Sequence, residues 1–269
     1  MKWRNDAMMN LSLVGKKAIV SGGSQGIGKA IAIELASLGA TCILLARNEA
    51  SLKLACESLD TGSGQKHQFY VIDFNNREAL EKLISTIASK ETIEILINNS
   101  GGPSAGMIID ADESEFEKAF GQHVICNHII TKHLIPGMKL NGYGRIINII
   151  STSVRIPLDN LGVSNTIRGA VASWSKSMSN ELAQYGITVN SLLPGFIATS
   201  RLDAVATHFS QKAQVEKEVM VERMKSSVPA KRFGEPTEIA VVAAFLASPA
   251  ASYVNGVSIP VDGGRTGTI

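Results

Sequence analysis

The sequence predicts an α/β protein built on a doubly wound, seven-stranded parallel sheet with helices on both faces. Short apolar runs of strand length alternate with longer runs that have helical periodicity, and a glycine-rich turn follows the first apolar run. The apolar runs are continuous rather than alternating, which is typical of parallel strands covered by helices on both sides. Strand-helix alternation of this kind is typical of doubly wound sheets.

Each expected strand except the last is followed by an expected helix. In chain order the strands and their helices are 18–20 with 26–38, 42–45 with 48–58, 69–72 with 76–90, 93–97 with 113–139, 146–150 with 163–185, 188–192 with 236–247, and finally 257–261. Ligands of open α/β sheets bind beyond the carboxyl ends of the strands. We therefore expect functional side chains directly after strands.

Composition limits the classes of protein that fit. A chain of 269 residues with 45% hydrophobic residues can bury one large core, so we expect a single domain over 1–269, with 1–14 as an N-terminal extension. The net charge of +2 gives no field that would attract nucleic acid. No apolar run has the length of a signal peptide or a membrane span, so we expect a cytoplasmic protein without membrane contact.

The cysteines and histidines do not indicate a metal site. The three cysteines, Cys42, Cys56 and Cys126, show no paired ligand spacing and are expected to be reduced thiols. The recurrence of histidine at His123, His128 and His133 distributes the rings around a helix instead of placing them on one face. We predict that no metal is bound.

The glycine-rich turn is the strongest single motif. Residues 22–28 read Gly-Gly-Ser-Gln-Gly-Ile-Gly and join the first expected strand to the first expected helix. Glycines here let the backbone approach a pyrophosphate, whose charge is met by the free amides and dipole of the helix N-terminus. A tight turn that needs glycine for steric reasons alone is the alternative.

Several further motifs occur in a fixed order, and together they resemble the short-chain dehydrogenase/reductase family, especially its 3-oxoacyl-carrier-protein-reductase-like members. The motifs are 21–28, 98–101 (Asn-Asn-Ser-Gly), 144–151, 189–190, 194–199 (Pro-Gly-Phe-Ile-Ala-Thr), 232–236 and 261–264. The resemblance covers about 16–264 and implies a Rossmann-type fold that binds a nicotinamide dinucleotide.

The resemblance also implies where the cofactor lies. Pyrophosphate is expected on the turn, adenine near the end of the third strand, the adenosine ribose after the fourth strand, and nicotinamide after the sixth. The residues concerned are, in that order, Gly22, Ser24, Gln25, Gly26, Ile27 and Gly28; Asp73; Asn98, Ser100 and Gly101; and Pro194, Gly195, Ile197 and Thr199.

The end of the second strand favours NADP(H) over NAD(H). NAD-preferring relatives commonly carry an acidic residue there for the ribose hydroxyls, whereas this chain has Ala46 followed by Arg47. The planar guanidinium of Arg47 suits a 2′-phosphate. The alternative is that Arg47 is an ordinary surface residue. Gln25 also weighs against the choice of NADP(H), because NADP-preferring relatives often have a second basic residue at that position.

The catalytic pattern of the family is only partly present. Counting along the motifs, the family's Asn, Ser, Tyr and Lys correspond to His123, Ser151, Ser164 and Arg168. Because a Ser hydroxyl is a much weaker acid than Tyr, Ser164 is expected to bind rather than titrate. Arg168 can orient the cofactor but cannot relay a proton. His123 could exchange protons near neutrality, or be a helix histidine packed beside Cys126.

We therefore expect an NADP(H)-dependent oxidoreductase that interconverts a small-molecule carbonyl and a secondary alcohol. In it Ser151 would polarise the carbonyl, and Ser164 with His123 or water would supply the proton. A cofactor-binding protein with little turnover, serving sensing or regulation, is the alternative.

Residues 200–233 contain a charged, helix-like stretch that could form a lid over the substrate. Relatives pair subunits through the helices here expected at 113–139 and 163–185, so a homotetramer is expected.

Overall fold

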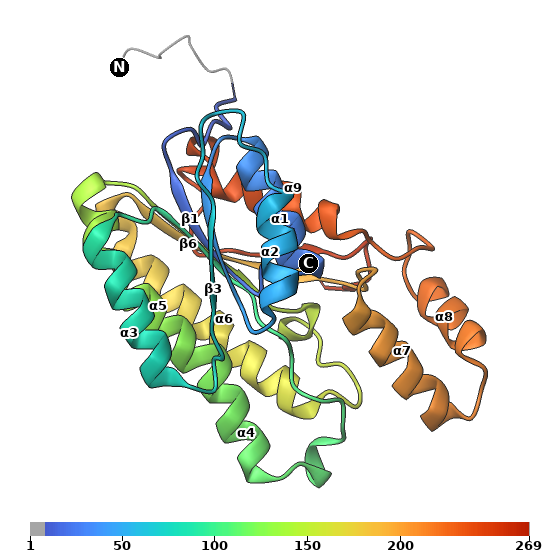
Figure 1. Cartoon of the computed structure of the whole chain (residues 1–269). Coiled ribbons are helices and arrows are strands. Elements are labelled where there is room, and N and C mark those ends of the chain that lie inside the picture. The colour runs from blue at the N-terminus through green and yellow to red at the C-terminus, as the bar shows by residue number, and fades with distance from the viewer. Residues whose placement is uncertain (1–8, 269) are drawn as a thin grey trace.

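The computed structural model describes residues 9–268, and it confirms the predicted doubly wound parallel sheet (Figure 1). The seven strands lie in the order β3-β2-β1-β4-β5-β6-β7, and every neighbouring pair is parallel. Their bounds are β1 Lys17–Ser21, β2 Thr41–Ala46, β3 Gln68–Val71, β4 Ile95–Asn98, β5 Gly144–Ile149, β6 Ile187–Pro194 and β7 Ser258–Val261.

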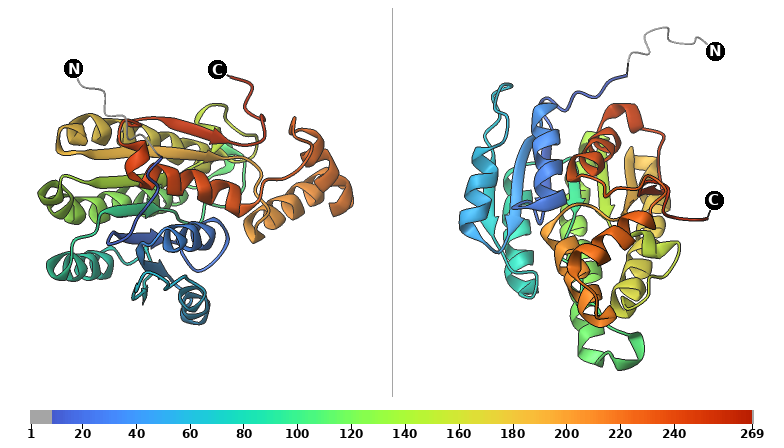
Figure 2. Two further views of the ribbon diagram at one scale, coloured as in Figure 1. Left: turned by 90° about the horizontal axis from the view of Figure 1, so that it is seen from above. Right: turned by 90° about the vertical axis from the view of Figure 1, so that its right-hand side faces the viewer.

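Helices cover both faces of the sheet (Figure 2). Helices α1, α2 and α9 pack on one face, and α3, α5 and α6 pack on the other. The α-helices are α1 Gly26–Ser37, α2 Glu49–Glu57, α3 Arg77–Lys90, α4 Glu113–Phe120, α5 Cys126–Asn141, α6 Gly162–Leu182, α7 Ser200–Ala213, α8 Lys217–Ser226 and α9 Pro236–Ala247. None of the helices within 9–268 is both long and apolar enough to cross a membrane.

The two helical layers explain why the strands are continuously apolar. Along β1, Ala18 and Val20 belong to the hydrophobic cluster beneath α1 and α9, whereas Ile19 between them belongs to the cluster beneath α3 and α5. All three side chains are completely buried. Since successive side chains of a strand point to opposite faces, a sheet covered on both sides favours apolar residues at consecutive positions.

Two helical segments differ from the sequence expectation. The helix expected over 113–139 is interrupted between α4 and α5 by a π-helical turn, Gly121–Ile125, which contains His123. Such turns insert a residue into the helical ladder and occur frequently at functional sites. The stretch after β6 forms two helices, α7 and α8, because Gln214 takes a left-handed conformation with φ 52° and ends α7.

The connection pattern places a crevice beside β1. From β1 the chain passes through β2 and β3 toward one edge of the sheet, and β4 then returns to the other side of β1. The carboxyl ends of β1 and β4 lie on either side of this reversal, which is the usual ligand site of an open parallel sheet. Helices α7 and α8 project from the body of the molecule near the same ends (Figure 1).

Candidate active site

The turn between β1 and α1 needs its glycines in two different ways. A Cβ on Gly28 would lie 2.2 Å from the carbonyl oxygen of Gly22, and one on Gly22 would lie 2.6 Å from the carbonyl oxygen of Asn99. These two glycines are therefore required by backbone packing alone. Gly26 has φ 54°, and a Cβ there would meet only the side chain of Thr199, at 3.4 Å, so Gly26 keeps the mouth of the turn open.

The first turn of α1 presents unsatisfied amides. The N-cap residue Gln25 makes no side-chain capping hydrogen bond, and the first amide with a backbone acceptor is that of Lys29, which donates to the Gln25 carbonyl at 3.2 Å. Within the described part of the chain, the amides of Gly26, Ile27 and Gly28 have no acceptor. Free amides at a helix N-terminus form an anion site, so the turn fits a pyrophosphate.

The end of β2 lies directly against this turn, since the amide of Gly22 donates to the Leu45 carbonyl at 2.8 Å. Arg47 follows as an exposed residue, and it forms no ion pair with a carboxylate of residues 9–268. Asp73, after β3, accepts hydrogen bonds from the backbone and side chain of Asn75. Those bonds, helped by the charge of Arg47, lower the pKa of Asp73. Arg47 and Asp73 thus lie close together.

The floor of the site is a buried polar chain that crosses three strands. Asn98 Nδ2 donates to Asn148 Oδ1 at 2.8 Å, and Asn148 Nδ2 donates to Ser175 Oγ on α6 at 3.1 Å. Ser191 Oγ donates to the same Ser175 hydroxyl at 3.2 Å. The Asn98 side chain, expected to touch the cofactor ribose, is only 2% exposed and instead joins β4 to β5. This polar chain has no signal in the sequence, because the ends of adjacent strands become neighbours only in the folded sheet.

His123 is buried beside the loop that follows β4. Its Nδ1 lies 2.8 Å from Ser100 Oγ, and the residue is 2% exposed. Its Nε2 has no hydrogen-bond partner among residues 9–268. Burial, followed by the charge of Arg168, lowers the pKa of His123 to about 2. The expectation that His123 exchanges protons near neutrality is therefore wrong for this environment. The imidazole is neutral and positions Ser100.

This buried histidine should make stability depend on pH. Its pKa is about 2 in the fold against a model value of 6.5, so the unfolded chain binds the proton first, and stability falls as pH drops below about 6.5. The free energy of unfolding should therefore be about 1.4 kcal/mol lower at pH ~5.5 than at pH ~7.5. Urea unfolding of the wild-type chain and of His123→Gln at both pH values checks this. Equal pH dependence in the two chains would contradict it.

The other three family positions lie at the end of β5 and the start of α6. Ser151 is half-buried, and its hydroxyl accepts a hydrogen bond from the Ser153 amide at 3.1 Å. Ser164 lies in the first turn of α6, half-buried and without a side-chain hydrogen bond to the described residues. Arg168, one turn later, donates from Nη1 to the Ile149 carbonyl at 3.0 Å and so ties α6 to β5. The fold brings these positions to one corner.

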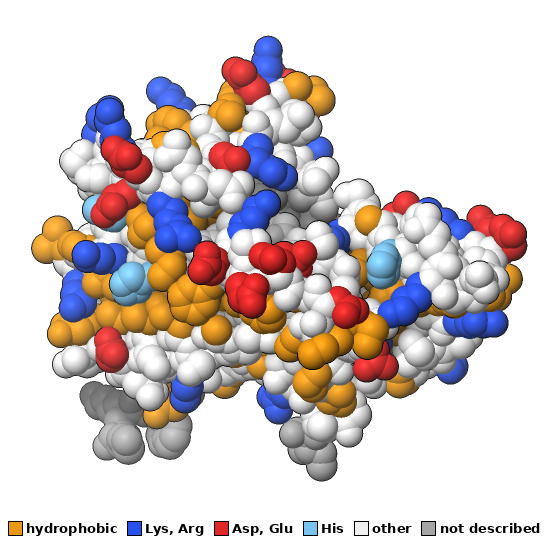
Figure 3. Space-filling model, turned by 90° about the horizontal axis from the view of Figure 1, so that it is seen from below, with side chains coloured by type: hydrophobic (Ala, Val, Ile, Leu, Met, Phe, Trp, Pro, Cys, Tyr) orange, Lys and Arg blue, Asp and Glu red, His pale blue; other side chains and the backbone are white. Residues whose placement is uncertain are grey.

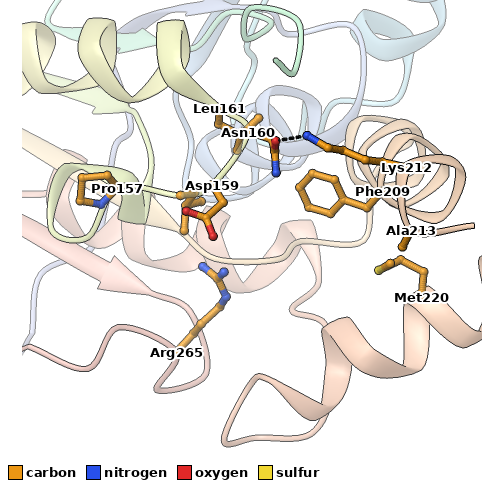
Figure 4. A pocket seen from close by; sticks show the side chains of 10 residues that line it. Pro157, Asp159, Asn160, Leu161, Phe209, Lys212, Ala213, Met220 and Arg265 are labelled. Carbon is orange, nitrogen blue, oxygen red and sulfur yellow. Dashed lines mark hydrogen bonds between the residues drawn. The ribbon is translucent and has the colours of Figure 1, made fainter. Parts of the chain in front are cut away.

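A cleft of about 460 Å³ opens between the loop after β5 and the projecting helices (Figure 4). Residues 157–161 form one wall, α7 and α8 form the other, and Arg265 closes the side. Lys212 on α7 donates a hydrogen bond to the side chain of Asn160 across the cleft. Figure 4 shows Asp159 and Arg265 pointing toward one another. Arg265 was not expected from the sequence, since only the folded C-terminal segment brings it here.

Comparison with known proteins agrees with this geometry. The family model described as Enoyl-(Acyl carrier protein) reductase matches residues 22–266. The 3-oxoacyl-(acyl-carrier-protein) reductase FabG of Vibrio cholerae is 34% identical over 258 residues, covering 94% of this chain and 98% of that protein. The NADPH-dependent reductase BacG of Bacillus subtilis is 32% identical over 256 residues, covering 94% of this chain and 99% of that protein.

Solved structures are similar over nearly the whole chain. The crystal structure of YwfH, an NADPH-dependent reductase involved in bacilysin biosynthesis, superposes with a TM-score of 0.89 at 32% identity and covers 94% of this chain and 99% of its own. L-Sorbose reductase from Gluconobacter frateurii, complexed with NADPH and L-sorbose, gives a TM-score of 0.89 at 29% identity, with coverage of 97% and 100%.

The fold and the dinucleotide turn thus define a nicotinamide-dependent oxidoreductase class. The chain belongs to the short-chain dehydrogenase/reductase family, and it resembles the 3-oxoacyl-carrier-protein reductases within it. The family and fold predicted from the sequence are confirmed. The expectation that Ser164, Arg168 and His123 stand at the family's catalytic positions stays a prediction from the sequence motifs.

Proposed function

We propose that the protein is an NADP(H)-dependent oxidoreductase that reduces a small-molecule carbonyl to an alcohol, with an atypical catalytic set. The observation that carries this proposal is the open anion site at the start of α1, beside which Arg47 forms no ion pair with a carboxylate of residues 9–268. The NADPH dependence of the relatives BacG and YwfH supports the choice of cofactor.

The residues present fit a dinucleotide. The amides of Gly26, Ile27 and Gly28 would hold its pyrophosphate, and Arg47 its 2′-phosphate. Gly101 would let it approach closely, because a Cβ there would meet no atom within 4 Å. Further contacts would come from Ser24 and Gln25 in the turn, Asp73 and Ser100 after β3 and β4, and Pro194, Gly195, Ile197 and Thr199 after β6. When bound, the nicotinamide supplies the hydride for the carbonyl carbon.

The chain's own residues would polarise the carbonyl and deliver the proton. Ser151 donates a hydrogen bond to the carbonyl oxygen. Arg168 holds positive charge beneath that oxygen and orients the nicotinamide ribose. Ser164 binds a water or the substrate oxygen and passes on a proton that comes from solvent, since its own hydroxyl does not ionise near neutrality. Neutral His123 fixes Ser100 in the loop beside the cofactor.

A cofactor-binding protein with little turnover is the competing function. Two measurements distinguish the reductase from the cofactor-binding protein. NADPH binding is titrated through its fluorescence, and NADPH oxidation is followed with a panel of ketones, diketones and oxo acids. Our proposal expects tight NADPH binding together with turnover of at least one class of carbonyl. Tight binding with no turnover across the panel would favour the competing function.

We further propose that the chain forms one domain, that it works in the cytoplasm, and that α7 and α8 act as a lid. Its three cysteines are free thiols, which fits the reducing cytoplasm.

The lid would close over the cleft through contacts such as the one between Lys212 and Asn160. Hydrogen exchange over 200–226 should slow when NADPH and a substrate are both bound. Unchanged exchange there would exclude a lid.

A homotetramer paired through α4, α5 and α6 is our proposed assembly. Figure 3 shows hydrophobic side chains gathered over the face to which α5 and α6 contribute. Trp174 on α6 is half-buried, with its ring edge-to-face against His128 of α5 at 6.4 Å, and Phe120 of α4 is 42% exposed. Self-complementary pairing would bury such faces. A light-scattering mass equal to the single-chain 28.6 kDa would contradict the tetramer.

A further inference from the structure

Two arginines from different helices converge on one point beside Gly102. A Cβ on Gly102 would lie 3.4 Å from Arg168 Nη2 and 3.5 Å from Arg201 Nη2. Arg168 comes from α6 and is 8% exposed, whereas Arg201 comes from the first turn of α7 and is exposed. Because Gly102 has no side chain, the space between the two guanidinium groups stays open.

No carboxylate of residues 9–268 neutralises either arginine. Arg168 donates to the Ile149 carbonyl, and Arg201 donates from Nη2 to the Pro103 carbonyl at 2.5 Å. These bonds hold the two groups in place but leave both charges uncompensated. Burial and the charge of Arg201 lower the pKa of Arg168 to about 10, which shows how little the pair is stabilised by the protein itself. An anion between the two would remove this cost.

The arginine pair lies between the dinucleotide turn and the cleft. Thr199, two residues before Arg201, reaches the mouth of the turn at Gly26, while the helix that starts there continues to Lys212 in the cleft wall. The loop that carries Pro103 continues to Gly106, whose amide donates to the carbonyl of Asn160 in the opposite wall at 2.8 Å. The loop from Gly102 to Gly106 therefore runs from the arginine pair to the cleft wall, while the segment that enters α7 lies beside the dinucleotide turn.

The cleft itself favours an anion. Its charged lining consists of Lys212 and Arg265 against the single carboxylate of Asp159. Arg168 and Arg201, which lie outside this lining beside Gly102, add two further cations without adding a carboxylate. Excess charge of one sign in a cleft attracts ligands of the other sign, and guanidinium groups bind carboxylates through paired hydrogen bonds.

We propose that Arg168 and Arg201 bind the carboxylate of the substrate, so that the carbonyl compound reduced here is an oxo acid. The proposal rests on the reductase function proposed above. In the reaction the carbonyl carbon would accept a hydride supplied by bound NADPH, the C=O π bond would break, and the oxygen would take a proton from solvent. The products are a hydroxy acid and NADP⁺, and the carboxylate is unchanged.

The test compares oxo acids with their uncharged esters. Pyruvate, acetoacetate and levulinate, which place the carboxylate at increasing distance from the carbonyl, are each paired with their methyl ester, and NADPH oxidation gives kcat/KM. We expect at least one acid to exceed its ester about 10-fold or more. Arg201→Gln should lower that acid-to-ester ratio by about 10- to 100-fold, the range of one charge-assisted contact. Arg223→Gln, which removes an exposed arginine of α8 away from the cleft lining, should leave the ratio unchanged.

The acids and NADPH are also titrated by calorimetry, so that binding is read without turnover. Arg201→Gln should weaken acid binding to the NADPH complex while the Kd for NADPH stays within about threefold. If Arg201→Gln weakened NADPH binding as much as acid binding, the proposal would be overturned, because Arg201 would then bind a phosphate of the cofactor. Absence of acid binding, or no difference between acids and esters, would overturn it as well. If the acids bind in a way that depends on Arg201 but no NADPH is oxidised, the carboxylate subsite is supported. The proposed reductase activity would then be contradicted.

Discussion

The double substitution Ser164→Tyr with Arg168→Lys is expected to raise kcat/KM for carbonyl reduction by about 10²-fold or more. General acid catalysis contributes typically about 10²- to 10⁴-fold, and a Tyr hydroxyl beside a Lys ammonium is a far stronger acid than an aliphatic alcohol. Ser164 makes no side-chain hydrogen bond to residues 9–268 that its replacement would break. Lys at 168 preserves the positive charge beneath the site. The measurement is NADPH oxidation with a small diketone and with an oxo acid.

A phenylalanine control isolates the hydroxyl. Ser164→Phe with Arg168→Lys introduces the same ring and the same ammonium but no acid, so it should not gain activity. The gain in the tyrosine variant should also fall as pH rises through the pKa of the new phenol. Equal rates in the two double variants would show that the shape of the pocket, rather than the missing acid, limits the reaction.

The fold could be predicted from the sequence because its signals are local. A continuously apolar run such as Ala18-Ile19-Val20 carries the information that helices cover both faces, and the structure places Ile19 in one core cluster and its two neighbours in the other. The break at 121–125 was not visible. A π-helical turn changes the hydrogen-bond ladder by one residue, and the one glycine in it, Gly121, is equally compatible with an uninterrupted helix.

The candidate site could be predicted only in part. The glycine-rich turn and Arg47 could be recognised in the sequence, because each directly follows an expected strand. The pKa of His123 was not, since it depends on burial and on Arg168, which lies far along the chain. The pairing of Arg168 with Arg201 was also hidden, because two helices that start at the ends of different strands bring them together. Electrostatic environment is a tertiary property and has no local sequence pattern.

The same limit shows in the polar chain under the site. Asn98 belongs to a motif that implies a cofactor contact, yet its side chain is used to join β4 to β5. Its Oδ1 atom remains without a partner among the described residues. Spacing along the chain identifies only the segment at the end of β4, whereas the direction of the side chain is set by strand register, in which Asn98 pairs with Asn148.

Arg47→Ala is expected to lower the affinity for NADPH by about 10- to 100-fold and to leave the affinity for NADH nearly unchanged. A charge-assisted contact to phosphate contributes roughly 1.5 to 3 kcal/mol, and only NADPH carries the 2′-phosphate that Arg47 would meet. Arg47 is exposed and has no carboxylate ion pair in residues 9–268, so its removal should not unfold the chain. Fluorescence titration with both cofactors gives the two dissociation constants.

Two further variants make this result specific to the position of the charge. Arg47→Lys keeps the charge but loses the planar fork, so it should retain part of the preference for NADPH. Lys53→Ala removes an exposed cation of the neighbouring helix α2 and should change neither affinity. If the wild-type chain binds NADPH and NADH equally, the assignment of Arg47 fails. If Lys53→Ala weakens NADPH as much as Arg47→Ala does, the preference comes from the general positive field of this edge of the sheet, and not from a guanidinium placed against the 2′-phosphate.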